Sequence, residues 1–270
     1  MCATDARDRG IEARSSARDG VWPTRWQAWT MTYKELVAES RQQAEADPAW
    51  VGSDAHLQLL QEALEPLVGV QGVRVRWADP GEGSHWHRES SEVRMRQVPP
   101  NDGASPVDAA ETHFALTLMH EGLHALLSSS AEEFFVQINA MPPRTRGMAD
   151  GLFQRLEDGR IRLKGIEARP ELKQAIDVHT RGATYTLVGL AMKAKFGQTK
   201  QPISRQAQLL LALQVYALAP EAAESLILHP DVAAALGSLK PVVDATRSLE
   251  TADCGAAAIE LVSTVQTLPD

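Results

Sequence analysis

The chain has 270 residues, of which 44% are hydrophobic and 23% charged, and it carries a formal net charge of −8 at pH 7. This composition is typical of a folded globular protein with one large domain or two small ones, and it excludes a wholly disordered chain. The acidic balance disfavours nucleic-acid binding over the whole surface, because it repels a phosphate backbone.

The sequence also restricts the compartment and the kind of metal site. The two cysteines, Cys2 and Cys254, are too few for a disulfide framework or an all-cysteine zinc site, and they fit a reducing environment. No apolar run reaches the about 18 residues of a membrane span, and the first residues lack the apolar core of a secretory signal. We therefore expect a cytoplasmic protein that binds neither nucleic acid nor a membrane.

The N-terminal region is expected to contain little structure before two helices. Residues 1–30 mix arginine, aspartate and small residues without a helical or strand period, which predicts a disordered extension. The helical spacing of Trp22, Trp26 and Trp29 leaves docking of this segment on the body as an alternative. After an opening helix, an amphipathic pattern from Asp54 predicts a second one.

A small sheet is predicted next. Alternating apolar and polar residues over Val73–Trp77 and Glu92–Val98 indicate two strands, joined through a loop that contains His85 and His87. We expect these two strands to pair antiparallel. From Ser105 onward nearly every segment has a helical pattern, so the sequence predicts an α+β fold that is predominantly helical and ends in a helical bundle.

The segment from Ser105 to Ser129 predicts a helix of about six turns that carries the chemistry. Within it lies the run His-Glu-Gly-Leu-His, residues 120–124. The i, i+4 spacing places the imidazoles of His120 and His124 on one face, where they can hold one divalent ion. Glu121 is rotated from them by about 100°, which allows it to act on a metal-bound water as a general base.

A zinc site of this type needs a third protein ligand. A metzincin would have a histidine at position 130, but Ser130 stands there. The best candidates are Glu157 and Asp158, which follow an apolar stripe in the next helical segment. The alternative is a solvated charge cluster with the neighbouring arginines. Spacing alone does not order the two adjacent carboxylates, so either could be the ligand.

Both segments resemble a known family. The runs HEGLHALL and LFQRLEDGRI are similar to the metallopeptidase-like region of the CobT-type subunit of aerobic cobaltochelatase and its von Willebrand A-associated and phage-encoded relatives. The likeness covers roughly residues 73–270. This sequence has Gln154 and Arg162 where the family pattern has Asn and Glu, and no Asp-x-Ser-x-Ser motif of a von Willebrand A domain follows.

The resemblance implies a fold and an order of the two carboxylates. It favours Glu157 as the third metal ligand, with Asp158 as a group that orients a histidine or as the alternative ligand. It further implies a zincin-like core over residues 31–164, in which a small antiparallel sheet packs on the helix that carries the His-Glu-x-x-His motif. Residues 165–270 would form a helical C-terminal part packed on this core.

The predicted function is that of a zinc-dependent metallopeptidase with one zinc ion per chain. His120, His124 and Glu157 would hold the ion, while Glu121 takes a proton from the metal-activated water that attacks a peptide or protein substrate. One alternative is an inactive metal-binding scaffold, associated with a chelatase, that docks an AAA+ ATPase or a von Willebrand A protein. Another is a helical domain without a metal. Iron, manganese or cobalt would also suit such ligands.

Other polar residues are weaker candidates for the site. His113 shares a helix face with His120, but it is expected to be a core histidine, and His85 and His87 are expected to be exposed. His179 or Tyr185 could donate a hydrogen bond to the oxyanion of a tetrahedral intermediate.

Overall fold

A computed structural model of the chain describes residues 35–68, 72–97, 105–116, 120–168, 170, 173, 176–177 and 203–269. The fold is predominantly helical and has one three-stranded mixed sheet, which confirms the expected α+β class. The predicted extension, residues 1–30, lies outside the described residues, and so do His179 and Tyr185. No helix in these ranges is long and apolar enough to cross a membrane.

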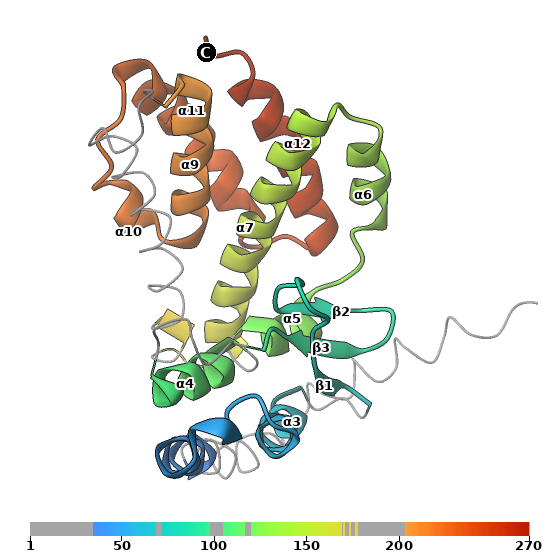
Figure 1. Cartoon of the computed structure of the whole chain (residues 1–270). Helices are drawn as coiled ribbons and strands as arrows, with labels where there is room; N and C mark the ends of the chain where they lie inside the picture. The colour runs from blue at the N-terminus through green and yellow to red at the C-terminus, as the bar shows by residue number, and fades with distance from the viewer. Residues whose placement is uncertain are drawn as a thin grey trace, which may run out of the picture.

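The sheet rests on a layer of helices from the first part of the described chain. A helix over residues 35–46 is followed by the 3-10 turn η2 (Pro48–Trp50) and by α3 (Asp54–Val68). In Figure 1, α3 lies beneath the sheet. The buried apolar side chains of α3 whose burial the structure describes are Leu59, Leu60, Ala63 and Leu64. Their helical spacing is the amphipathic pattern that predicts this helix.

The sheet consists of β1 (Arg74–Trp77), β2 (His85–His87) and β3 (Glu92–Met95) in the order β1-β3-β2. Strands β2 and β3 are antiparallel, with Trp86 opposite Val93. Strands β1 and β3 are parallel, so the predicted antiparallel pairing of these two runs is wrong. The reason is that the intervening loop contains a third strand, which reverses the chain once more before β3.

A side chain of α3 covers the outer edge of β1. The Gln61 side chain on α3 donates to the Val73 carbonyl oxygen over 2.9 Å and accepts from the Val75 N–H over 2.6 Å, next to the outer edge of β1. An uncovered strand edge would offer free backbone groups to other chains. At the other end of the sheet, β2 contacts α5 (Gly122–Leu127).

Helix α4 (Pro106–Leu116) begins as the sequence predicts, because the Ser105 hydroxyl accepts from the Asp108 N–H over 3.1 Å. Residues 120–121 have π-helical winding and lead directly into α5. Residues 117–119 lie outside the described part. The middle of the helix predicted over residues 105–129 thus lies outside the described residues, and its last described turn ends at Leu127.

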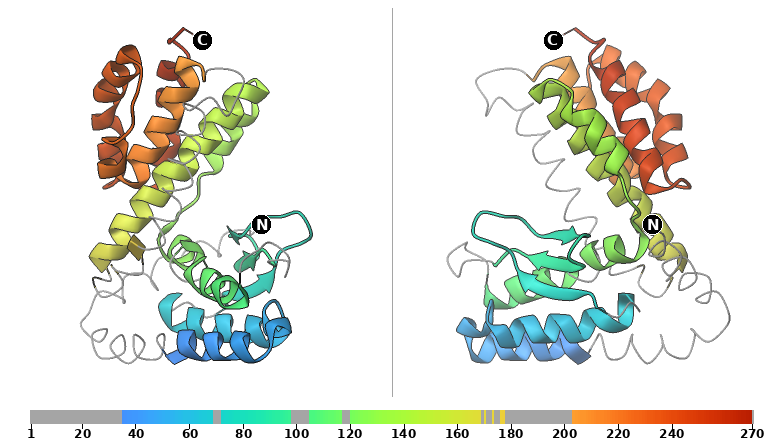
Figure 2. Two further views of the ribbon diagram at one scale, coloured as in Figure 1. Left: turned by 60° about the vertical axis from the view of Figure 1, so that its left-hand side comes forward. Right: turned by 90° about the vertical axis from the view of Figure 1, so that its right-hand side faces the viewer.

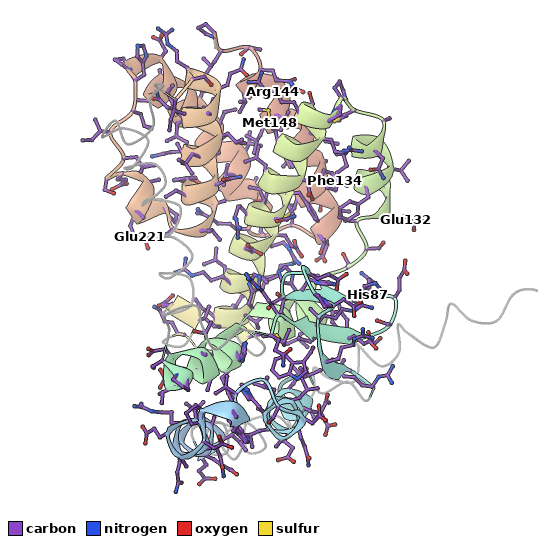
Figure 3. The ribbon with its side chains drawn as sticks, viewed as in Figure 1. His87, Glu132, Phe134, Arg144, Met148 and Glu221 are labelled. Atoms are coloured by element: carbon purple, nitrogen blue, oxygen red, sulfur yellow. The ribbon has the colours of Figure 1, made fainter. Side chains whose placement is uncertain are left out.

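The remaining helices form a second group above the sheet. They are α6 (Glu132–Asn139), α7 (Pro143–Ala168), α9 (Arg205–Leu218), α10 (Pro220–Ala223), α11 (Pro230–Thr246) and α12 (Thr251–Val265). Figure 3 shows Phe134 on the side of α6 that faces α7 and α12. The centroid of its ring lies 4.5 Å from the ring centroid of Phe153 on α7.

Helix α7 connects the two groups. Both views in Figure 2 show it running from the upper helices down to the layer that contains the sheet and α5. Its Leu152 and Leu156 belong to the apolar core of the upper helices, while Ile161 belongs to the core around the sheet. The domain boundary expected between residues 164 and 165 therefore falls inside this one helix.

Candidate metal centre

His120, His124 and Asp158 come together where α5 packs against α7. Among the residues that the structure describes, they form the one group of three or more His, Cys, Asp or Glu side chains whose ligand atoms all lie within 4.8 Å of one another. The two imidazole ring centroids are 4.8 Å apart, with an interplanar angle of 89°. The imidazoles thus lie side by side, as their i, i+4 spacing predicts.

Local structure positions each of these side chains. His120 lies in the π-helical turn, a winding that is often found at functional sites, and His124 lies in α5 itself. Asp158 is on the central part of α7. The two helices approach closely because residue 165 of α7 is a glycine, where a Cβ atom would lie 3.1 Å from the methyl carbons of Leu123.

The distances from Asp158 to the two imidazoles are short enough for one metal ion to contact all three side chains. Atoms bound about 2.0–2.1 Å from a zinc ion lie about 3.3 Å from one another when they are arranged tetrahedrally. Asp158 Oδ1 lies 3.2 Å from His124 Nε2 and 3.7 Å from His120 Nε2. The His120 side chain is 23% exposed, so the site is open to solvent at this ligand.

The charges around Asp158 favour its ionised form. Burial opposes ionisation, but His120, His124 and Arg155 outweigh it and hold the pKa of Asp158 well below its usual range. Arg155 Nη1 donates to Asp158 Oδ2 over 2.7 Å, whereas the other carboxylate oxygen faces the imidazoles. Asp158 thus presents one charged oxygen to the site while the arginine holds the other.

Glu121 lies beside the group without belonging to it. Its Oε1 is 3.9 Å from His120 Nε2, and the residue is only 3% exposed. Burial raises the pKa of Glu121 to about 7, although the nearby His124 works in the opposite direction. The backbone N–H of Trp86 on β2 also lowers this pKa, by less than His124 does. This is a suitable position for a base that acts on a metal-bound water.

Glu157 faces a different set of partners. Its carboxylate accepts from the buried Arg160 over two distances of 2.7 Å, from Ser128 Oγ over 2.6 Å and from Thr251 Oγ1 over 3.0 Å. Burial raises the pKa of Glu157, but these donors outweigh it and the net pKa is lowered. The geometry therefore favours Asp158 over Glu157 as the third ligand, the reverse of the order that the resemblance implies.

The other predicted histidines lie outside the group. His113 is fully buried and hydrogen-bonds the Arg96 carbonyl oxygen over 3.1 Å, as expected of a core histidine. His85 and His87 were expected in an exposed loop, but they form the ends of β2 and are partly buried. Of the two positions that depart from the family pattern, Gln154 is exposed and Arg162 pairs with Asp177.

Sequence reasoning missed two contributors, Ser128 and Arg155. Ser128 Oγ lies 3.0 Å from His124 Nδ1, and Arg155 holds Asp158. Both follow simple helical spacings, since Ser128 comes four residues after His124 and Arg155 three residues before Asp158. Those spacings are the signal that could have identified them.

Comparisons with known proteins do not add to this geometry. No protein-family model matches the chain, and no match was found among curated proteins or solved structures.

Proposed function

We propose that the chain is a zinc-dependent peptidase of the zincin type, in which His120, His124 and Asp158 hold the ion. The observation that carries this proposal is the spacing of the three ligand atoms, with distances of 3.2 and 3.7 Å from Asp158 Oδ1 to the imidazole nitrogens. Structural zinc sites are normally closed by four protein ligands, whereas catalytic ones keep a position open. Three ligands with a buried carboxylate beside them support the catalytic type.

The side chains around the ion have separate roles in this proposal. A bound zinc ion supplies a Lewis acid and a water whose pKa is lowered towards 7. Glu121 would accept a proton from the attacking water and donate it to the leaving amine. Arg155 holds the Asp158 carboxylate in place through a hydrogen bond of 2.7 Å.

The position of β2 supports a peptide as the substrate. This strand lies at the edge of the sheet and contacts α5, the helix that contains His124 and directly follows Glu121. An extended peptide can add to such a strand edge through main-chain hydrogen bonds. A peptide bound along β2 would have its backbone next to Glu121 and the metal ligands.

Replacing Glu121 tests the catalytic role separately from metal binding. We expect the Glu121→Gln variant to retain one zinc ion per chain and to lose hydrolysis of unfolded proteins by about 10²–10⁴-fold, the usual contribution of a general acid–base group. The matched control is Glu133→Gln on the exposed surface of α6, which should cleave like the wild type. The measurements are elemental analysis of untagged protein and cleavage of unfolded proteins and peptide libraries.

Two outcomes would contradict the proposal. One is a Glu121→Gln variant that cleaves as fast as the wild type. The other is a wild-type chain that binds zinc and cleaves none of these substrates, which would favour the metal-binding scaffold that docks an AAA+ ATPase or a von Willebrand A protein.

A further inference from the structure

We propose that Ser128 and Glu157 form a hydrogen-bond relay that positions His124 as a metal ligand. The relay runs from Glu157 through the Ser128 hydroxyl to the Nδ1 side of the imidazole, and it directs Nε2 at the metal. This inference rests on the proposed metal site. Ser128 and Glu157 are positioning residues in it, because neither touches the ion or the substrate.

The direction of the hydrogen bonds follows from the number of protons available. Ser128 Oγ lies 2.6 Å from Glu157 Oε1 and 3.0 Å from His124 Nδ1. The Ser128 hydroxyl donates to Glu157, and this uses its single proton. The hydroxyl oxygen must then accept a proton from His124 Nδ1. A neutral imidazole with its proton on Nδ1 keeps the Nε2 lone pair free for a metal ion.

The relay is held at both ends. At the His124 end, Ser128 is the residue that ends α5, and its backbone N–H donates to the His124 carbonyl oxygen over 2.9 Å. At the Glu157 end, Arg160 donates to both carboxylate oxygens over 2.7 Å and to the carbonyl oxygen of Leu127 over 2.9 Å. Arg160 is fully buried, so it ties the end of α5 to α7 inside the protein.

The relay gives the adjacent acids of α7 complementary tasks. Consecutive residues of a helix are rotated by about 100°, so Glu157 and Asp158 leave α7 in different directions. Asp158 Oδ1 lies 3.2 Å from His124 Nε2, whereas Glu157 reaches Nδ1 of the same ring through Ser128. Two neighbouring carboxylates thus act on opposite sides of one imidazole.

Removing the Ser128 hydroxyl tests the relay. Groups behind a metal ligand typically contribute 10–100-fold in metal affinity, so the Kd for zinc should rise by about that factor in Ser128→Ala. Ser128→Thr keeps the hydroxyl and should restore the Kd to within about threefold of the wild type. The matched control is Ser129→Ala, because Ser129 uses its backbone N–H to bind Thr251. The Kd values are measured by competition with a chromophoric chelator.

A second measurement reports on the His124 proton itself. In proton NMR of the zinc-loaded wild type, the His124 Nδ1–H should exchange slowly with solvent, because it is donated to Ser128. We expect this resonance to exchange at least about tenfold faster in Ser128→Ala and to be unchanged in Ser129→Ala. The wild-type spectrum tests the relay even where a variant fails to fold.

The possible failures can be told apart. A Kd for Ser128→Ala equal to that of the wild type, or a rapidly exchanging Nδ1–H in the wild type, would overturn the relay alone. Zinc binding without any peptide hydrolysis would contradict the peptidase alone, since both relay measurements are made on zinc binding. A wild-type chain that binds no zinc would overturn both.

Discussion

Glu157 and Asp158 are chemically similar neighbours with different surroundings. Asp158 faces two imidazoles and a partly exposed arginine, whereas Glu157 faces a fully buried arginine and two hydroxyls. A carboxylate can bind a metal ion only where its lone pairs are not occupied by strong donors. The direction in which each residue leaves the helix therefore decides which acid is available as a ligand.

This difference predicts that one isosteric substitution acts mainly on zinc affinity and the other mainly on the free energy of unfolding. Asp158→Asn should weaken zinc binding by more than the about 100-fold that groups behind a ligand contribute, with a smaller effect on the unfolding of metal-free protein. Glu157→Gln should lower the free energy of unfolding by about 3 kcal/mol, because it leaves the charge of Arg160 without its buried partner. Chelator competition and urea denaturation measure the two effects.

The assignment of Asp158 as the third metal ligand would be contradicted if the two substitutions had the reverse effects on zinc binding. Glu157→Gln would then abolish zinc binding while Asp158→Asn left it intact.

A buried pair of imidazoles makes stability depend on pH. His56 and His113 are both fully buried with ring centroids 5.1 Å apart, and His56 Nδ1 accepts from the Gly52 N–H. Burial, followed by the charge of His113, lowers the pKa of His56 to about 3. Burial also lowers the pKa of His113.

The sign of the pH effect follows from these lowered pKa values. Below the ordinary histidine pKa of about 6.5 the unfolded chain takes up protons that the folded chain does not, so the free energy of unfolding falls as the pH falls. For His56 the loss should reach about 2 kcal/mol at pH 5. The measurement is urea denaturation of metal-free wild type and His56→Phe between pH 8 and pH 5. Parallel curves for the two proteins would contradict the prediction.

At the scale of elements, helices were easier to predict than the sheet. The period of α3 and the cap of α4 are local signals, and both are confirmed. The direction in which β1 and β3 pair depends on how often the chain reverses between them. That number was missed because β2 is only three residues long, too short for an alternating pattern to be recognised.

The contact between α7 and α9 depends on a single glycine. A Cβ atom at Gly159 would lie 2.2 Å from the carbonyl oxygen of Ala217, a backbone atom that cannot move aside without shifting α9. We expect Gly159→Ala to lower the free energy of unfolding by about 1–3 kcal/mol through overpacking. Gly147 lies on an exposed part of the same helix, with open space around it. There we expect Gly147→Ala to raise the free energy of unfolding by about 0.5–1 kcal/mol.

Urea denaturation of the two variants provides the test. An increase in stability for both would show that α7 and α9 do not need this close approach.

Across the whole molecule, the candidate site lies between two apolar cores. Leu156 on α7 belongs to the upper core and Ile161 to the lower one, so Asp158 is placed between them. The sequence indicates the histidine pair, because both residues lie on one short segment. It does not order Glu157 and Asp158, because their surroundings are formed by α5 and α12, and residues of α12 such as Thr251 are about a hundred positions away along the chain.

The most direct test of the metal centre is anomalous X-ray diffraction at the zinc edge from crystals of untagged protein grown with zinc. We predict one anomalous peak per chain, about 2.0–2.2 Å from His120 Nε2, His124 Nε2 and an Asp158 oxygen, with Glu157 bound to Arg160 and not to the metal. A zinc ion coordinated by Glu157 in place of Asp158, or no zinc at the histidine pair, would contradict the proposed site.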